Sequence, residues 1–192
     1  MSYVIQAGNL LIEFLFGAAI LLFLLRLLAE YWGVSFHNPV SQFIYRSTNP
    51  VLAPMRRLLR NLGRFNLAAL TTALALELIK LGLQMALYGR LPSPGAWLLL
   101  GAGQLLDLVL LVYIVLVFAW SLASMLGGDA RHPLLSFVAQ ITEPALRPLR
   151  RRMPTPGGID FSPAVALLLL FLLRILVAQP IIDAGSRALL AP

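Results

Sequence analysis

The chain contains no cysteine, and only 12% of its 192 residues are charged, whereas 59% are apolar. Without cysteine there is no disulfide framework, no thiolate metal site, no haem held by a CxxCH sequence and no cysteine nucleophile. Soluble domains carry about 25% charged residues, so the shortage of charge argues against an ordinary soluble surface. Disordered chains are poor in apolar residues, which excludes disorder as well. The mean hydropathy of +0.85 therefore favours a lipid bilayer as the surroundings of much of the chain.

Four segments are apolar enough to cross a bilayer, which takes about 20 helical residues. The third is longer than one crossing needs, so it must tilt or extend beyond the lipid. Residues 1–8 contain no lysine or arginine, which favours a retained first span over a cleavable signal. The sequence thus predicts an all-α membrane protein with four transmembrane helices. The predicted spans are residues 9–28, 66–88, 98–126 and 162–183.

The 15 lysine and arginine residues outnumber the 8 acidic residues, for a net charge of +7, and they concentrate in two loops, residues 30–65 and 127–161. The connection between the middle spans and the two termini contain only Arg90 and Arg187. Short loops rich in lysine and arginine stay in the cytoplasm, which predicts that both basic loops are cytoplasmic and both termini outside. Anionic lipid headgroups, rather than nucleic acid, are the partner expected for these arginines.

The two basic loops match each other without a gap, because Pro39 and Pro133 are 94 residues apart and the same offset holds throughout. The offset also pairs acidic and basic residues within the spans. Each half is therefore a span, a basic loop and a span, which predicts two repeats of one orientation, residues 1–95 and 96–192. The matched loop positions are Thr48 and Thr142, Pro50 and Pro144, Pro54 and Pro148, Arg56 and Arg150, Arg57 and Arg151, Gly63 and Gly157, and Asn66 and Asp160.

Each loop is expected to form amphipathic helices in the headgroup plane. Apolar residues recur at helical spacing after Pro39 and Pro133, both suited to a first helical position. A second short helix starting at Pro54 would turn Arg56 and Arg57 toward lipid phosphates. Such loops either anchor the protein and set its orientation, or also provide a specific docking site.

The end of the second loop has a different composition. Gly157 and Gly158 are followed by Asp160, Ser162 and Pro163. This order predicts a tight turn leading into a helix, capped by Asp160 or Ser162, with Pro163 in the first turn. The segment matches no phosphate-binding fingerprint, so a phosphate site is a weak interpretation.

Apart from Arg26 and Asp183 near span ends, five charged residues lie inside the predicted spans, where each costs roughly 2.5 to 3.5 kcal/mol to insert. The 94-residue offset matches Glu13 with Asp107 and Lys80 with Arg174. We expect ion pairs within each repeat, or crosswise between repeats, with Glu77 competing for Lys80 because it stands three residues before it. These pairs either select helix partners, or serve ion or proton permeation.

Other polar residues carry weaker signals. Arg26, near the cytoplasmic end of the first span, is expected to extend to lipid phosphates. His37 and His132 stand at the water interface without a ligand cluster, so no metal or other cofactor is expected. No arrangement of nucleophile and base, or of paired carboxylates, predicts catalysis, and we do not expect an enzyme.

The loop pattern is similar to that of the YggT family in both halves. The residues that carry the resemblance are Thr48, Asn49, Pro50, Leu52, Pro54, Arg56 and Arg57 in the first loop, and Thr142, Glu143, Pro144, Leu146, Pro148, Arg150, Arg151, Gly157, Gly158, Asp160, Ser162 and Pro163 in the second. The first copy departs from the pattern at Asn49, Arg64, Ala68 and Ala69, so the second copy is the one expected to act.

The resemblance implies a double-repeat inner-membrane protein linked to osmotic-stress tolerance, potassium balance or envelope integrity, with some single-repeat relatives encoded beside cell-division genes. Two functions remain open. A scaffold would dock anionic lipid and a membrane or cytoplasmic protein partner through its basic loops. Alternatively, a homo-oligomer would conduct or modulate a flux of potassium ions or protons, because four spans with few polar faces hardly enclose a pore alone.

Overall fold

The computed structural model describes residues 3–59, 61–89, 93–127, 129, 131–153 and 160–190, and within these it contains helices and turns but no β-strand. Leu62 and Phe65 form an isolated β-bridge in the turn after the second helix. A π-helical turn, Arg174–Ala178, joins the last two helices. The helices are α1 (Tyr3–Trp32), α2 (Pro39–Leu58), α3 (Leu67–Leu87), α4 (Pro94–Met125), α5 (Pro133–Arg150), α6 (Ser162–Leu173) and α7 (Gln179–Leu190).

Four helices are long and apolar enough to cross a membrane: α1, α3, α4 and the continuous stretch Ser162–Leu189. They fall where the sequence predicted spans, although α1 and α4 begin earlier because polar or small residues continue the helix beyond the apolar core. Large apolar side chains such as Phe14, Val115 and Leu176 are exposed on their outer faces. Exposed apolar surface of this extent requires a lipid or protein covering, so the chain is a membrane-type all-α protein.

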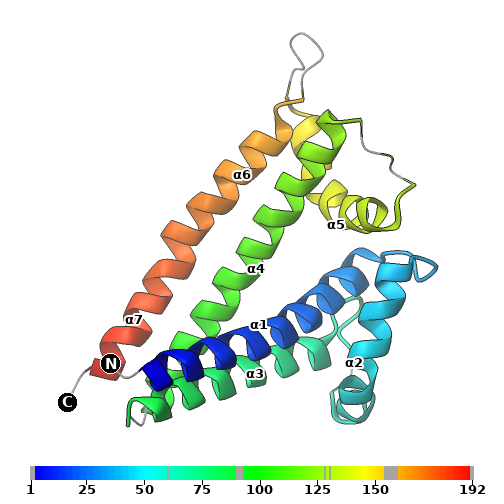
Figure 1. Ribbon diagram of the computed structural model, residues 1–192. Coiled ribbons are helices and arrows are strands. Elements are labelled where there is room, and N and C mark those ends of the chain that lie inside the picture. The colour runs from blue at the N-terminus through cyan, green and yellow to red at the C-terminus, as the bar shows by residue number, and fades with distance from the viewer. Residues whose placement is uncertain are drawn as a thin grey trace.

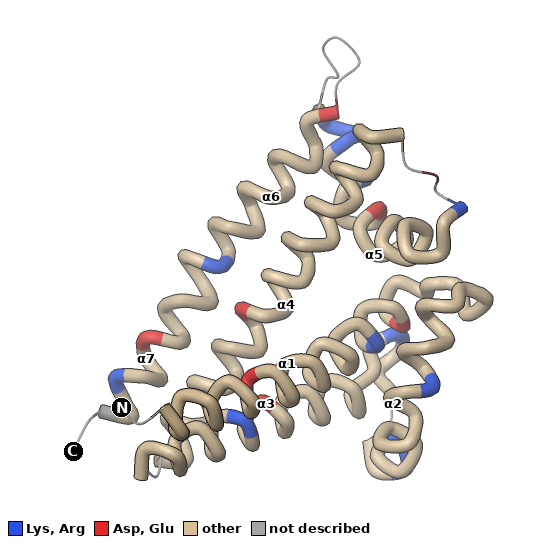
Figure 2. Tube along the Cα trace, viewed as in Figure 1, with Lys and Arg blue, Asp and Glu red and all other residues tan. Residues whose placement is uncertain are grey.

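The four long helices form two pairs (Figure 1). α1 packs along α3, and α4 packs along α6 and α7, while contacts between α3 and α4 join the pairs. The start of α1 and the end of α7 lie at the same end of the bundle, and α2 and α5 both lie toward the other end. Charged residues are sparse along the long helices (Figure 2), so each charge within them stands out.

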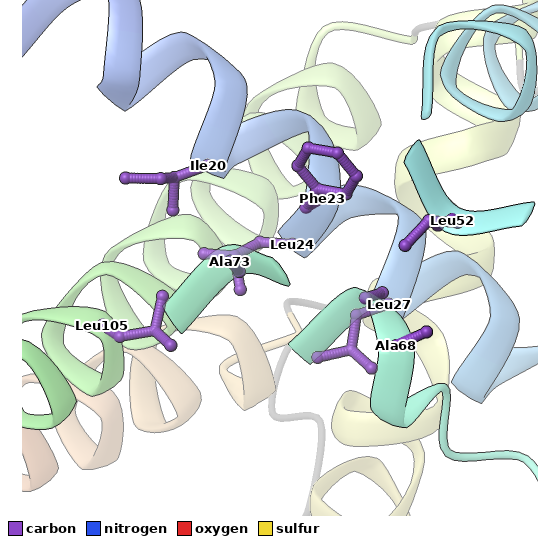
Figure 3. Close-up of a cluster of buried hydrophobic side chains, with 9 residues drawn as sticks. Ile20, Phe23, Leu24, Leu27, Leu52, Ala68, Ala73 and Leu105 are labelled. Atoms are coloured by element: carbon purple, nitrogen blue, oxygen red, sulfur yellow. The ribbon is translucent and has the colours of Figure 1, made fainter. Parts of the chain in front are cut away.

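A cluster of buried apolar side chains fills the space between α1, α2, α3 and α4 (Figure 3). Ile20, Leu24 and Leu27 of α1 meet the small residues Ala68 and Ala73 of α3. Small residues let membrane helices approach closely and gain packing contacts. A second cluster packs the two loop helices together through Ile44, Phe137 and Ile141. Both clusters therefore contain residues from both halves of the chain.

Equivalent positions of the two halves also end the helices alike. Gly33 follows α1 and Gly127 follows α4, and these glycines have φ angles of 68° and 70°. A left-handed residue after a helix is usually glycine because it has no Cβ to clash. Asn38 caps α2 by accepting the N–H of Val40 at 2.8 Å. Local chemistry therefore sets where the spans end and the loop helices begin.

The expectation of a second short helix beginning at Pro54 is wrong. α2 continues through Pro50 and Pro54 to Leu58, and α5 continues through Pro144 and Pro148 to Arg150. Prolines four residues apart lie on the same face of a helix. The missing backbone donors therefore fall along one side of each helix, and the buried side retains its contacts through Leu52 in α2 and Leu146 in α5.

Candidate functional site

An ion pair joins α4 to the π-helical turn of the last span. The Nε and Nη2 atoms of Arg174 donate to the two carboxylate oxygens of Asp107, each at 2.7 Å. A guanidinium that meets both oxygens of a carboxylate holds it in a fixed orientation. This is the pairing within one repeat, which the sequence left open against a crosswise pairing.

Lys80 of α3 lies between two carboxylates. Its Nζ atom is 2.9 Å from Oε1 of Glu77 and 3.6 Å from Oε1 of Glu13, which extends from α1. Gln84 donates to the other oxygen of Glu13 at 2.9 Å. The Glu77 side chain is 1% exposed, whereas that of Glu13 is 55% exposed. The first repeat therefore contains an acid, a base and a second acid in contact, rather than a simple pair.

A cavity of about 220 Å³ lies between the triad and the Asp107–Arg174 pair. Both halves of the chain line it, through α1, α3, α4 and α7. Four of the five predicted intramembrane charges thus come to one cavity, and Arg174 adjoins it through Asp107. The polar side chains that line the cavity are Glu13, Glu77, Lys80, Gln104 and Asp107.

The π-helical turn begins at Arg174 itself. A π turn holds one more residue than an α-helical turn and often marks a functional position. Arg174, which stands 94 residues after Lys80, therefore meets Asp107 at the point where the regular α-helix is interrupted.

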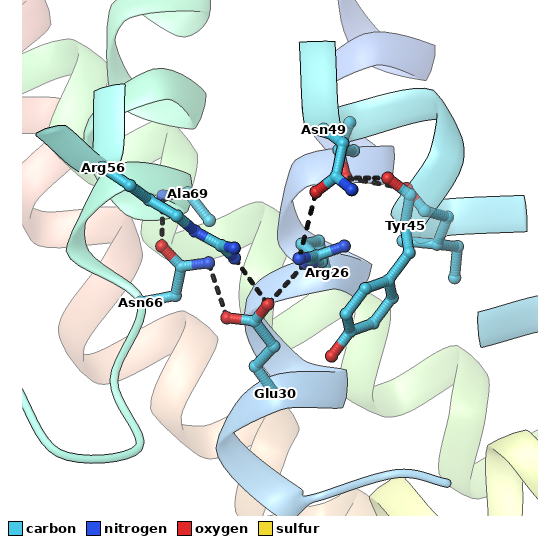
Figure 4. A network of polar contacts seen from close by, with 9 residues as sticks. Arg26, Glu30, Tyr45, Asn49, Arg56, Asn66 and Ala69 are labelled. Atoms are coloured by element: carbon cyan, nitrogen blue, oxygen red, sulfur yellow. Dashed lines mark hydrogen bonds and ion pairs between the residues drawn. The ribbon is translucent and has the colours of Figure 1, made fainter. Parts of the chain in front are cut away.

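A second polar cluster lies where α1, α2 and α3 meet, and sequence reasoning missed its central residue, Glu30 (Figure 4). Its Oε1 atom accepts hydrogen bonds from Arg26 at 2.6 Å and Arg56 at 2.7 Å. Its Oε2 atom accepts from Asn66 at 2.6 Å, and the Asn66 side-chain oxygen accepts the N–H of Ala69 at 3.0 Å at the start of α3. Glu30 thus connects three helices.

The expectation that Arg26 extends to lipid phosphates is wrong. Arg26 is 1% exposed and lies over the ring of Tyr45, 3.2 Å from its centroid. Because α2 folds back across α1, the Tyr45 ring and the Glu30 carboxylate take the place of phosphates. Burial, reinforced by the negative charge of Glu30, raises the pKa of Tyr45 above its ordinary value. Arg26 is therefore part of the packed interior.

The second repeat has an equivalent bridge at the same loop positions. Arg150 donates to Asp160 at 2.6 Å and to Glu143 at 2.7 Å. Asp160 also accepts the N–H of Ser162 at 2.9 Å, at the start of α6. Burial alone would raise the pKa of Asp160, but the hydrogen bonds from Ser162 and Arg150 lower it below its ordinary value. Each loop helix is thus linked by an arginine to the beginning of the next long helix.

The acids of the two bridges come from different places. In the first loop Asn49 and Asn66 stand where the second has Glu143 and Asp160, and Glu30 supplies the carboxylate instead. The absence of an acid at both of these first-loop positions was the sequence feature that indicated a carboxylate from elsewhere for Arg56. The position equivalent to Glu30 is a serine in the second repeat, and a pocket of about 380 Å³ opens there. It is lined by Trp120, Ser121, Ser124, Met125, Arg150, Asp160 and Pro163.

The other predicted loop residues occupy varied positions. Thr48 and Thr142 are buried and donate to backbone carbonyls four residues earlier, at 2.7 and 2.9 Å. Arg57 and Arg151 are exposed and form no ion pair with any described residue. Ser162 and Pro163 are buried in the first turn of α6. Gly157 and Gly158 lie outside the described residues. In the described part of the chain, no three histidine or acidic side chains form a metal-binding group.

Comparison with known proteins shows which family the chain belongs to. The CCB3/YggT family model matches twice, over residues 4–87 and 99–181. The chain is 33% identical to the uncharacterized protein YggT of Escherichia coli K12 over 186 residues, which cover 93% of this chain and 95% of the relative. An uncharacterized protein of Haemophilus influenzae is 30% identical over 154 residues, covering 80% and 82% of the two chains. No solved structure matches. The chain therefore belongs to the CCB3/YggT family, which it matches once in each half.

Proposed function

We propose that this protein is a multi-pass scaffold of the bacterial inner membrane that supports envelope integrity and osmotic-stress tolerance. One observation carries the proposal: each loop helix is tied to the start of the next long helix by an arginine bridge, Arg56 through Glu30 to Asn66, and Arg150 to Asp160. Such bridges hold basic segments rigidly beside the spans. Rigid placement is what a docking surface needs, because little ordering remains to be done on binding.

The proposed topology has two span–loop–span units in parallel, with α2 and α5 at the cytoplasmic headgroup level and both termini outside. The excess of arginine in the two large loops supports this orientation. α2 and α5 each bury one face and expose arginines near their C-terminal ends. Helices of this kind bind at the membrane surface, with arginines on anionic phosphates.

The docking surface would be built around Arg57 and Arg151, which remain exposed while their neighbours Arg56 and Arg150 are held in bridges. Unpaired guanidinium groups suit phosphates or carboxylates. The proposed partners are anionic lipid and either a membrane or cytoplasmic protein or a second copy of the chain. Catalysis forms no part of the proposal.

A complementation experiment tests the scaffold. A strain lacking the protein receives wild type, a loop variant (Arg150→Gln, Arg151→Gln, Asp160→Asn) or a span variant (Glu13→Gln, Lys80→Met, Asp107→Asn, Arg174→Met), with membrane abundance checked for each. A scaffold predicts that the loop variant inserts normally and fails to restore survival after hyperosmotic shock, whereas the span variant restores it. The corresponding first-loop variant, Arg56→Gln with Arg57→Gln, is compared with it to test whether the first loop is needed as well as the second.

The charged cavity favours a second candidate, an oligomer that conducts or modulates a flux of protons or potassium ions. Charges inside a membrane commonly mark ion pathways. If the span variant inserts normally but fails to restore survival while the loop variant succeeds, the scaffold proposal is wrong and flux measurements become the next step.

A further inference from the structure

The charges around the cavity do not balance. Three carboxylates, Glu13, Glu77 and Asp107, meet two bases, Lys80 and Arg174. With every group ionised, the cluster would carry a net charge of −1 inside the apolar part of the bundle. An uncompensated charge in such surroundings is strongly unfavourable, so the group neutralises or takes up a cation.

The imbalance is confined to the triad. Asp107 and Arg174 neutralise each other through two hydrogen bonds of 2.7 Å. Glu13 and Glu77, by contrast, share the single ammonium of Lys80 at 3.6 and 2.9 Å. Two carboxylates that share one cation in apolar surroundings cannot both ionise easily. The excess charge therefore belongs to the carboxylates of Glu13 and Glu77.

Of these two acids, Glu77 is the more deeply buried. Its side chain is 1% exposed, and its Oε2 atom is buried without a hydrogen-bond partner among the described residues. Glu13 is half-exposed and receives a hydrogen bond from Gln84. A buried carboxylate with no donor at one of its oxygens loses more by staying charged than a half-exposed one that receives a hydrogen bond. A proton on Glu77 removes that charge and leaves Lys80 to pair with Glu13.

We propose that Glu77, Lys80 and Glu13 form an intramembrane site that binds one proton, held by the Glu77 carboxyl group. A proton fits better than a metal cation because the ammonium of Lys80 already stands at the centre of the group and would repel one. The charged groups facing Glu77 are Glu13 from α1, Lys80 on its own helix and Asp107, paired with Arg174, across the cavity. α2, the remaining neighbour of α3, directs Arg56 to Glu30.

The cavity provides the route of exchange. Glu13, Glu77 and Asp107 all line it, and its volume of about 220 Å³ is ample for several water molecules. The proton comes from water in the cavity and returns to it, so no other reactant is needed. Because Glu13 belongs to α1 and Glu77 to α3, a change in the proton load alters the pairing that joins these helices. The inference is independent of the scaffold proposal.

Infrared spectroscopy of the purified protein in lipid nanodiscs tests the site, since a protonated carboxyl group has a C=O band that carboxylates lack. Charge balance predicts that wild type shows this band at pH 7. The band should disappear in Glu77→Gln, where Glu13 alone pairs with Lys80, and in Glu13→Gln, where Glu77 alone pairs with Lys80. In Lys80→Met the band should persist, because Glu77 then has no cation beside it. The double variant Asp107→Asn with Arg174→Gln removes a neutral pair and should keep the band.

Two outcomes overturn the proposal. One is the absence of a protonated-carboxyl band in folded wild type at pH 7, with folding verified by tryptophan fluorescence. The other is a band that persists in Glu77→Gln and disappears in the Asp107 and Arg174 double variant, which would locate the proton elsewhere. If wild type lacks the band and its melting temperature instead rises with potassium at constant ionic strength, a metal cation balances the charge.

Discussion

Arg56 donates to Glu30 at 2.7 Å, although these residues lie on different helices and the second repeat has nothing equivalent to Glu30. The same loop position in the second repeat, Arg150, pairs with Asp160 and Glu143 instead. The two halves therefore keep the arginine bridge while taking its carboxylate from different segments. A span residue replaces the loop acids in the first copy.

The first prediction follows from this exchange. Glu30→Gln should lower stability by about 3 kcal/mol, because it leaves the buried guanidinium of Arg26 without its counter-charge. Ser124→Ala, at the equivalent position of the second repeat, should change stability by no more than about 0.5 kcal/mol. Thermal unfolding in detergent, followed by tryptophan fluorescence, measures both. Equal effects of the two changes would show that the bridge contributes nothing specific.

Transplanting the acid provides the second prediction. Asn66→Asp should destabilise the wild-type protein, because the new carboxylate would face Glu30 in place of the amide that donates at 2.6 Å. In the Glu30→Gln background the same change should stabilise, since an acid at this position can pair with Arg56 as Asp160 pairs with Arg150. A double-mutant cycle over the four melting temperatures checks the change of sign. If Asn66→Asp destabilises both backgrounds equally, the two bridges are not equivalent.

The third prediction concerns the packing of α7 against α4. A Cβ atom added to Gly185 would lie 2.7 Å from the backbone nitrogen of Leu100 and 2.8 Å from its Cα. Backbone atoms cannot move aside as a side chain can, so Gly185→Ala should separate the helices and cost about 1 to 3 kcal/mol. Gly17→Ala is the matched control, because its Cβ would meet no atom within 4 Å. The melting temperatures of the two variants decide between close packing and a general effect of helix glycines.

The membrane ion pair gives the fourth prediction. Arg174→Met should destabilise the bundle by roughly 3 kcal/mol, because Asp107 then remains as an unpaired carboxylate. Replacing both partners, with Asp107→Leu and Arg174→Met, should recover most of the loss, since apolar residues of similar size need no partner in lipid. Melting temperatures in nanodiscs measure all three proteins. Failure of the double change to recover stability would mean that the pair does more than hold α4 and the π-helical turn together.

The sequence predicted the spans well because length and apolarity are local properties, and because the 94-residue offset compares the chain with itself. It also singled out Asp107 and Arg174, and it anticipated that Glu77 would compete for Lys80. Arg26 was misjudged for a physical reason. Whether an arginine near the end of a span reaches phosphates depends on what covers it, and here α2 folds back over it with Tyr45.

Prolines misled the prediction in a similar way. Pro54 suggested a helix start because proline removes a donor, but Pro50 and Pro54 lie on the exposed side of α2 and the buried side continues through Thr48 and Leu52. Tertiary packing on one face therefore carried the helix past both prolines. The acidic residues of the loops were the better indicator. Asn49 and Asn66 replace the two acids of the second loop, which indicates that Arg56 pairs with a carboxylate from another segment.

The fifth prediction is a pH dependence. Burial pushes the pKa of Asp160 upward, but hydrogen bonds from Ser162 and Arg150 lower it below the ordinary value of 3.8. A carboxyl group whose pKa is lowered by folding stabilises the protein above its ordinary pKa, and that contribution is lost as the pH falls through the lower, folded-state value. The stability difference between wild type and Asp160→Asn should thus be constant near neutral pH and shrink below about pH 4.

Asn38→Ala tests whether that dependence belongs to the carboxylate or to the cap. Asn38 and Asp160 both accept a backbone N–H at the start of a helix, at 2.8 and 2.9 Å, but only Asp160 titrates. The side chain of Asn38 donates to the backbone carbonyl of Pro133, which does not titrate either. The difference between wild type and Asn38→Ala should therefore stay unchanged from pH 7 to about pH 3, while that for Asp160→Asn shrinks. If both differences shrink together, acid weakens the whole loop region, and the bridge from Arg150 to Asp160 is not what holds α5 to α6.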